Sequence, residues 1–396
     1  MTEPVNLFAP EVRSDPYPTY ARLRRDAPVQ QVEPMGLWAV SRYQDVEYVL
    51  KNPQVFSSSG FEALLKPAWL PHNPIGDSIL VKDGAGHAKL RALLSRAFTP
   101  KSIARLEVRI REIAAALAGR LSTLGEADFV AEFCSPLPGR VIAEIIGVDP
   151  ELHREFKRWV GHLTMISPMY PGDELAAAIR TTVSEMEGYL KEVLAARRRA
   201  PKDDMVSDLI GAEVDGHRLT DDEIIAFLFV LLPGGLETTM HLLATIMLGF
   251  TQRPDEFARL RADRSLVPAY VEEALRKEPP LHGILRLTLA EVDIAGVRVP
   301  PAAMVLVLLG SANHDETKFV EPERFDVARD KKTGFPFGHG AHFCLGAPLA
   351  RLEARIVIEE LVARFRGFER LPGELEWNVA VVVRGPVALP IRVLPV

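Results

Sequence analysis

The chain has 396 residues, of which 47% are hydrophobic and 25% are charged, and its formal net charge is −6. This composition is that of a globular protein with a large core, and the negative balance gives no sign of nucleic acid or an anionic membrane as a partner. Two cysteines, Cys134 and Cys344, are too few for a disulfide framework and favour a reducing, cytoplasmic compartment. Because the first residues are polar and no stretch reaches about 18 uninterrupted apolar residues, we expect neither a signal peptide nor a membrane anchor.

The predicted elements are mostly helices, and no repeat or long linker separates them, so we predict one domain over residues 1–396. Apolar residues recur at helical spacing in several segments, and alternating or β-branched runs indicate a few strands. Helices are expected at 15–25, at 102–121, at 174–199 and from Thr220 to about Phe250. A further helix is expected directly after the strand that begins at Gly36. Short strands are expected near 285–299, 303–308 and 379–393. The sequence thus predicts a mainly α fold with a minor antiparallel β portion.

The apolar helix that begins near Thr220 carries an acid and an alcohol, Glu237 and Thr238, in its middle. Such groups need partners in an apolar setting. Pro233 cannot donate a helical hydrogen bond, and the paired glycines Gly234 and Gly235 loosen the next turn. The pattern predicts a kink or groove with room for a small molecule. The alternative is an ordinary kinked core helix whose threonine bonds its own backbone.

Residues 337–346 read Phe-Gly-His-Gly-Ala-His-Phe-Cys-Leu-Gly. Gly338 and Gly340 allow a tight loop before Cys344, and Gly346 allows close packing after it. Such a loop can direct backbone N–H groups at the sulfur, and the helix predicted from Ala347 adds a positive partial charge beside it. These features favour a thiolate, whereas a buried structural cysteine in a glycine-rich turn is the alternative.

This segment resembles the heme-binding loop of the cytochrome P-450 superfamily, the heme-thiolate monooxygenases. The fixed positions of that loop are filled by Phe337, Gly338, Gly340, His342, Cys344 and Gly346. The resemblance covers essentially the whole chain and implies the triangular helical prism of the P-450 fold. It also implies heme b as cofactor, with Cys344 as the ligand of its iron.

Further matches to the family assign roles to other residues. Gly234, Gly235, Glu237 and Thr238 match its oxygen-binding groove, in which Thr238 would hydrogen-bond O2 and Glu237 would help relay protons, although Pro233 is unusual at its position. Glu273 and Arg276, with Arg324 from the stretch Pro322–Phe325, would form a buried network that fixes the chain before Cys344. Contacts to the heme propionates are implied for His87, Arg91, Arg286 and His342, where the alternative is a solvated base.

The chain shows no dinucleotide fingerprint, so the resemblance implies that electrons come from a separate ferredoxin and ferredoxin reductase. We expect the redox partner to dock through Lys89, Arg96, His339 and Arg351. The expected substrates are O2 and a lipophilic small molecule such as a terpenoid, steroid, fatty acid or macrolide-like compound. The walls of the substrate pocket are expected to come from residues 61–80, 165–170, 281–284 and 381–383. The candidate substrate contacts are Val230, Pro233, His282 and Val382. The alternatives are a peroxygenase, isomerase or dehydratase on the same fold, or a heme-binding sensor without turnover.

Overall fold

The computed structural model describes residues 5–148, 152–167, 169–329, 334–380 and 382–396. The chain folds into two compact units that are each assembled from separate stretches of sequence. Unit 1 comprises Met1–Phe56, Glu107–Pro138 and Glu237–Val396, and unit 2 comprises Ser57–Leu106 and Gly139–Leu236. The single domain expected from the sequence stays a prediction.

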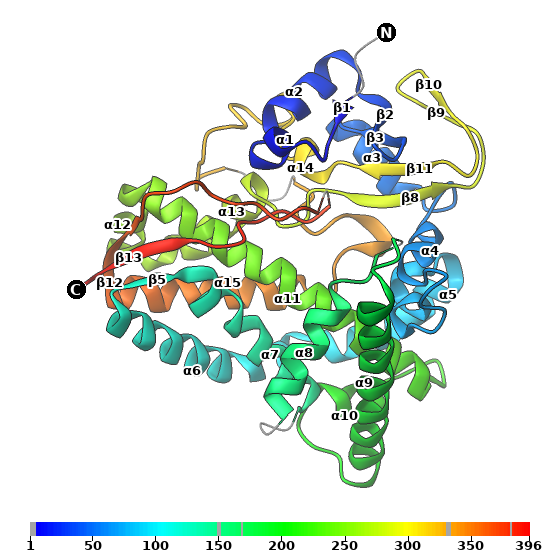
Figure 1. Ribbon diagram of the computed structural model, residues 1–396, viewed down its shortest axis with the longest axis horizontal. Helices are drawn as coiled ribbons and strands as arrows, with labels where there is room; N and C mark the ends of the chain where they lie inside the picture. The colour runs from blue at the N-terminus through cyan, green and yellow to red at the C-terminus, as the bar shows by residue number, and fades with distance from the viewer. Residues whose placement is uncertain (1–4, 149–151, 168, 330–333, 381) are drawn as a thin grey trace. The chain divides into compact units, whose positions relative to one another are not determined.

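Unit 1 contains a mixed sheet whose strands run in the order β1-β2-β3-β11-β8-β4 (Figure 1). Its strands are β1 Val5–Asn6, β2 Val29–Glu33, β3 Leu37–Val40, β4 Phe56–Ser57, β8 Ile284–Thr288 and β11 Met304–Val307. The pairs β1/β2 and β3/β11 are parallel, whereas β2/β3 and β8/β11 are antiparallel. The predicted mainly α fold with a minor antiparallel β portion is confirmed, since most strand pairs are antiparallel, and the parallel pairs β1/β2 and β3/β11 were not foreseen.

The core beside this sheet is made of β-branched and aromatic side chains. Val40, Val305 and Val307 are completely buried in it, and Phe335 from the segment before Cys344 joins the same cluster. The helices that flank this part of unit 1 are α1 Pro10–Ser14, α2 Tyr17–Asp26, α3 Tyr43–Lys51 and α14 Leu309–Ala312. The sheet core thus extends directly to the cysteine loop and anchors its entry.

The remaining helices of unit 1 pack on one another around α15. This helix, Ala347–Arg364, contacts α12 and α13. The other elements here are α12 Pro254–Ala262, α13 Val267–Lys277, the hairpin β9 Val292–Ile294 with β10 Val297–Val299, and the sheet of β12 Phe365–Arg370, β13 Pro390–Pro395 and β5 Glu126–Asp128. Three helices, α6 Pro100–Leu124, α7 Pro136–Ile146 and α11 Asp221–Gln252, begin in one unit and end in the other.

Unit 2, in the part of it that the structure describes, is helical apart from one small hairpin. The long helix α9, Asp173–Arg199, contacts both α8, His153–Leu163, and α10, Met205–Gly211 (Figure 1). Its other elements are α4 Glu62–Leu65, α5 Gly84–Leu94 and the hairpin of β6 Glu213–Val214 with β7 His217–Arg218. The predicted helix at 174–199 is confirmed almost to the residue.

The helix α11 runs from Asp221 to Gln252 without interruption at Pro233. The spacing of Thr220 and Glu223 is typical of a capping box, and the structure has one: Glu223 accepts from the Thr220 N–H at 2.9 Å and the Thr220 hydroxyl accepts from the Glu223 N–H at 3.2 Å. By length and composition α11 could cross a membrane, but 56% of its most apolar window is buried inside the protein. This burial matches the core helix expected from the sequence.

Most predicted elements are confirmed, and the errors are confined to short ones. The mainly helical fold and the helices near 15–25, 102–121 and 220–250 are found. Among the elements that were not predicted are the helices α1, α7, α8, α10 and α12 and the strands β1, β2, β5 and β12. The expected strand at 379–393 is shorter, because β13 begins only at Pro390 and the preceding segment forms isolated bridges.

Candidate functional site

The loop that carries Cys344 depends on two glycines with left-handed backbone angles. Gly338 has φ 71° and Gly340 has φ 69°, where other residues are strained. A side chain at position 340 would also come within 3.1 Å of the Leu50 carbonyl oxygen. The turn brings the Cys344 N–H to the Phe337 carbonyl, which accepts its hydrogen bond at 3.1 Å. The glycines therefore fold the loop back on itself and fix the cysteine backbone.

A buried asparagine and an aromatic stack anchor the start of this loop. The side-chain oxygen of Asn313 accepts the Phe335 N–H at 2.7 Å. The Phe335 ring stacks on Tyr43 with 4.5 Å between ring centroids. Both contacts fix the chain two residues before Phe337, so the loop begins from a rigid support.

The two cysteines lie in opposite environments. Cys134 is completely buried, and this burial raises the pKa of its thiol well above the ordinary value. Cys344 is exposed and precedes α15, whose N-cap is Gly346. A helix N-terminus favours a negative charge, so Cys344 is the thiol that its surroundings suit for a thiolate.

Arg351, on the second turn of α15, braces the loop from the side. Its guanidinium lies 4.5 Å from the centre of the Phe337 ring and makes paired contacts of 2.6 and 3.0 Å to the Glu272 carboxylate. Such bidentate pairs are strong and directional. They hold Phe337 beside the cysteine loop.

The other residues of unit 1 that the sequence assigns to the cofactor also suit a large anionic group. Arg286 on β8 is only 6% exposed and donates to the Leu285 carbonyl at 2.8 Å, and His342 is half-buried. A buried guanidinium is matched by carboxylates, and an exposed thiolate is a ligand for iron. The residues present therefore fit heme. His87, which is buried, and Arg91, which is half-buried, lie one turn apart on α5 in unit 2, and their role stays a prediction.

Helix α11 has a partly open strip in an otherwise buried surface. Residues 233–238, with Val230 and Met240, are partly or fully exposed, whereas 224–229 and 241–250 are buried. Among the exposed positions, Val230, Pro233, Gly234, Glu237 and Thr238 recur at intervals of three and four and so share one helix face. The groove predicted here from the sequence stays a prediction.

The paired glycines of α11 have different surroundings. A side chain on Gly235 would come within 2.8 Å of the Ile142 side chain on α7, so glycine is needed there for close helix packing. A side chain on Gly234 would meet no atom within 4 Å. Gly234 therefore belongs to the open strip, and Gly235 to the packing.

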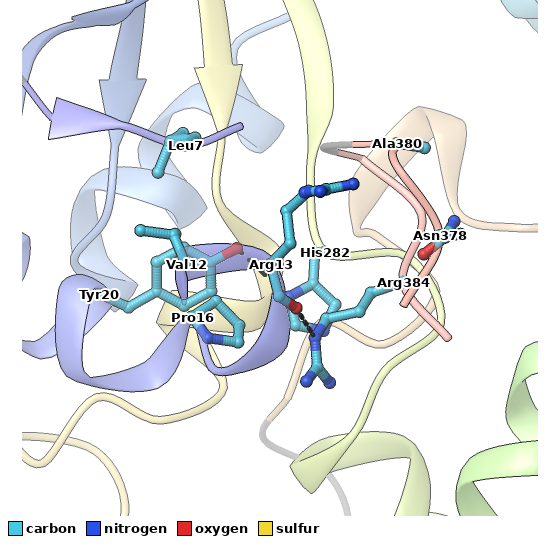
Figure 2. A pocket seen from close by; sticks show the side chains of 9 residues that line it. All are labelled: Leu7, Val12, Arg13, Pro16, Tyr20, His282, Asn378, Ala380 and Arg384. Atoms are coloured by element: carbon cyan, nitrogen blue, oxygen red, sulfur yellow. Dashed lines mark hydrogen bonds between the residues drawn. The ribbon is translucent and has the colours of Figure 1, made fainter. Parts of the chain in front are cut away.

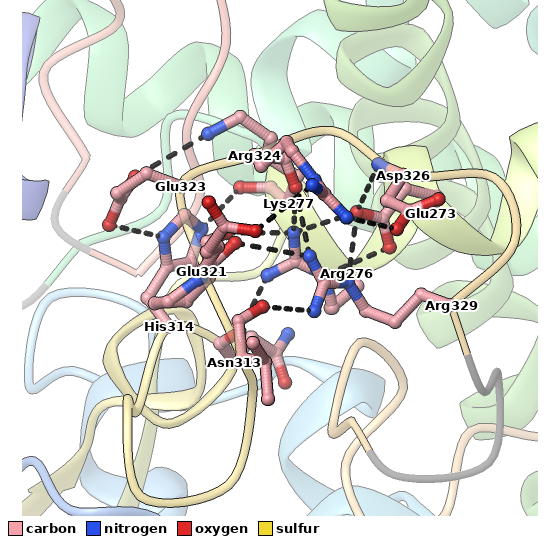
Figure 3. Close-up of polar contacts among 12 residues, drawn as sticks. Glu273, Arg276, Lys277, Asn313, His314, Glu321, Glu323, Arg324, Asp326 and Arg329 are labelled. Carbon is pink, nitrogen blue, oxygen red and sulfur yellow. Dashed lines mark hydrogen bonds and ion pairs between the residues drawn. The ribbon is translucent and has the colours of Figure 1, made fainter.

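Glu273 and Arg276 form the expected buried pair in unit 1 (Figure 3). Their two contacts measure 2.9 Å, and Arg276 also donates to the carbonyls of Asn313 and Pro322 at 2.9 Å. This links the C-terminal turn of α13 to the segment that leads to Cys344. The network stabilises the fold and does not touch the site itself.

The assignment of Arg324 to this network was wrong for its side chain. That side chain is 60% exposed and pairs with Glu321 and Asp326, and only the Arg324 carbonyl meets Arg276, at 3.5 Å. The second arginine beside Glu273 is Arg329, at 3.3 Å. The turn after Phe325 brings this later residue back, which a linear motif does not reveal.

His282 is buried beside Tyr20, whose hydroxyl lies 3.2 Å from its Nδ1, and burial lowers the pKa of the imidazole well below the ordinary value. It lines a cavity of about 20 Å³, room for one water molecule. Figure 2 shows Arg13, Asn378 and Arg384 around the same cavity. The backbone N–H of His282 donates to the Val382 carbonyl at 2.7 Å, so these two candidate substrate residues are adjacent. Val381 and residue 168 lie outside the described residues.

The protein is mainly helical and presents an exposed cysteine from a glycine-rich loop at a helix N-terminus. The same unit contains a buried guanidinium. These are the features of a heme-thiolate protein. The sequence matches the cytochrome P450 family over residues 30–374. The chain belongs to the cytochrome P450 family, whose members are monooxygenases.

Similar proteins come from several bacteria. Cytochrome P450 107B1 of Saccharopolyspora erythraea is 37% identical over 96% of this chain and 95% of its own. The structure of CYP109Q5 from Chondromyces apiculatus is 40% identical with a TM-score of 0.91 over the whole of both chains. That of CYP109E1 from Bacillus megaterium, in complex with testosterone, is 34% identical with a TM-score of 0.86 over 96% of this chain and 99% of its own.

Proposed function

We propose that the protein is a heme b monooxygenase that inserts one oxygen atom of O2 into a lipophilic small molecule, by hydroxylation or epoxidation. The observation that carries this proposal is the placement of Cys344, exposed after a glycine loop and at the N-terminus of α15. Family membership supports the reaction class.

Residues of the cysteine loop and of other segments have proposed parts in holding the cofactor. The Cys344 thiolate would bind the heme iron, and Phe337, fixed by Arg351, would pack beside the sulfur. Arg286 and His342 in unit 1, with His87 and Arg91 in unit 2, would bind the propionates. When bound, heme supplies the activation of O2, which a cysteine ligand favours.

The exposed strip of α11 is proposed to handle protons and substrate. The hydroxyl of Thr238 would donate a hydrogen bond to O2 next to Gly234. The carboxyl of Glu237 would help relay protons to the same place. Val230 and Pro233 on the same face, with Val382 and His282, are the proposed substrate contacts. The complex of CYP109E1 with testosterone supports a lipophilic ligand such as a steroid.

Electrons are proposed to come from a ferredoxin and its reductase, in the cytoplasm. Lys89 and Arg96 are exposed in unit 2, and His339 is half-buried in unit 1. Arg351 is already paired with Glu272, so reversing its charge would also disturb the cysteine loop. Lys89→Glu with Arg96→Glu is therefore the cleaner test: it should raise the ferredoxin concentration for half-maximal rate, more so at low salt, and leave substrate binding unchanged. No change at any salt concentration would move the docking site elsewhere.

The test of the function is the spectrum of the reduced protein with carbon monoxide. We expect the long-wavelength band of a thiolate-ligated heme, and its loss in Cys344→Ser. Cys134→Ser is the matched control and should keep the band. A thiolate band that persists in Cys344→Ser would overturn the assignment.

A second measurement separates the alternative functions. With added ferredoxin and reductase, a monooxygenase consumes reduced pyridine nucleotide and O2 in proportion to hydroxylated product. A peroxygenase would turn over with peroxide alone, an isomerase or dehydratase without electrons, and a sensor not at all.

A further inference from the structure

His241 is a buried histidine one helical turn after Glu237 on α11, and both belong to unit 1. Its side chain is 3% exposed, and its Nε2 lies 3.9 Å from the Glu237 Oε1. Its Nδ1 is buried and has no hydrogen-bond partner among the residues that the structure describes. Since positions i and i+4 share a helix face, the imidazole and the carboxylate belong to the same face of α11.

Leaving a buried imidazole nitrogen without a partner is costly, so its presence needs a reason. Packing alone would be served by an apolar side chain of similar size. The surroundings are instead shaped around the ring, because a side chain at Gly385 would come within 2.0 Å of Nδ1 and 2.3 Å of the ring carbon beside it. Only a glycine at position 385 lets the ring occupy this place.

The segment with Gly385 is itself held firmly. Gly385 and Asn378 exchange two hydrogen bonds of 3.1 Å, one from the Gly385 N–H to the Asn378 side chain and one from the Asn378 N–H to the Gly385 carbonyl. The neighbouring Arg384 is paired with Glu278 at 3.0 Å. The segment that lies against the His241 ring is therefore held in place.

We propose that His241 is a positioning residue for Glu237. Its Nε2–H donates to the Glu237 carboxylate, either after a small rotation of the carboxyl, which is 33% exposed, or through one bridging water. The contact orients the carboxylate toward Thr238 and away from bulk solvent. This inference rests on the proposed function for its consequence in turnover, but the contact itself exists whether or not the reaction is a monooxygenation.

The contact is tested first without any turnover, by NMR of protein labelled with ¹⁵N-histidine. The signal that disappears in His241→Gln belongs to His241. In Glu237→Gln we expect the His241 ring nitrogens to shift and the signals of His314 to stay, because His314 is paired with a different carboxylate, Glu323, at 2.9 Å. Glu323→Gln is the reciprocal control. Unchanged His241 ring shifts in Glu237→Gln would overturn the proposal.

The consequence is tested next, by the fraction of electrons that end in product and not in peroxide. His241→Leu should lower this fraction severalfold, whereas His241→Gln, which keeps a donor, should retain most of it. Gly385→Ala should reproduce the loss without altering either polar group, because it displaces the ring. Gly367→Ala is the matched control, since a side chain there meets Leu394 at an ordinary 3.5 Å.

The outcomes separate the two proposals. If Cys344 holds no heme, the NMR result still decides the His241 contact. If the protein is a monooxygenase but His241→Leu couples electrons to product as well as the wild type does, His241 has no positioning role and the proposal fails. A loss shared equally by His241→Gln and His241→Leu would indicate packing alone and would also overturn it. Substrate-induced spectral changes in each variant verify that the protein is folded.

Discussion

Two clusters of polar side chains in unit 1 differ in how tightly they are held. Around Arg276, the guanidinium meets Glu273 and the carbonyls of Asn313 and Pro322, all at 2.9 Å. Around Glu237, by contrast, the contact with His241 measures 3.9 Å, and the carboxyl is one-third exposed. The first cluster is fixed in one arrangement, and the second can rearrange.

This difference matches the roles proposed for the two regions. A buried pair with several short contacts over-determines the backbone, which suits the support of a cysteine that must stay in place. A carboxyl that passes protons must gain and lose them, and tight pairing would hold it in one state. The fold therefore combines a rigid support for the cofactor with loosely held groups on α11.

The largest effect is expected from breaking the rigid cluster. Arg276→Ala leaves Glu273 buried without its main partner and should lower the free energy of unfolding by about 3–5 kcal/mol. Arg324→Ala removes an exposed side chain of the same type and should change stability by no more than about 0.5 kcal/mol. Urea unfolding of both variants measures the difference, and equal losses would show that Arg324 belongs to the network after all.

The loosely held cluster should respond in turnover and not in stability. Thr238→Ala should keep the fold and the substrate-induced spectral change but lose about 10²–10⁴ in productive rate, with electrons diverted to peroxide. Thr245→Ala is the control on the same helix, since its hydroxyl bonds only the carbonyls of His241 and Leu242 among the contacts described. Product and peroxide are counted against nucleotide consumed. Unchanged coupling in Thr238→Ala would remove its role.

A smaller loss is expected where the rigid region meets the cysteine loop. Asn313→Ala leaves the buried Phe335 N–H without its 2.7 Å acceptor and should cost about 1–3 kcal/mol. Asn6→Ala removes the same type of bond, in which the Phe8 N–H donates to the Asn6 side-chain oxygen at 2.8 Å, but on the surface, where water replaces it. Unfolding midpoints in urea compare the two, and the proposed support is wrong if they fall equally.

The sequence predicted the local parts of these regions better than their long-range contacts. The glycine loop, the capping box of α11 and the Glu273–Arg276 pair all depend on residues a few positions apart, so their spacing was informative. Arg329 and Asn313 join the network through the fold of the chain between α13 and the cysteine loop, which spacing does not encode. His241 could have been noticed four residues after Glu237, but its burial against Gly385 depends on a segment about 140 residues away.

The smallest effect is a change with pH at the edge of the rigid region. Glu323 contacts the buried His314 at 2.9 Å, and this hydrogen bond holds the pKa of the Glu323 carboxyl down to about 2. An unfolded glutamate titrates near about 4.3, so the unfolded state takes up the proton first as the pH falls. The stabilising contribution of Glu323 is therefore complete above about pH 5 and disappears as the pH approaches 2.

Comparison with Glu323→Gln isolates this contribution. The wild type should be more stable than the variant near about pH 5.5, and the two unfolding midpoints should converge toward about pH 2.5. Histidines of the unfolded chain are protonated at both of these pH values, so their titration does not contribute to the difference. The difference should be modest, because the Glu323 side chain is 59% exposed and solvent screens the pair. A gap between the midpoints that stays constant across this range would mean that the His314 contact does not lower the Glu323 pKa.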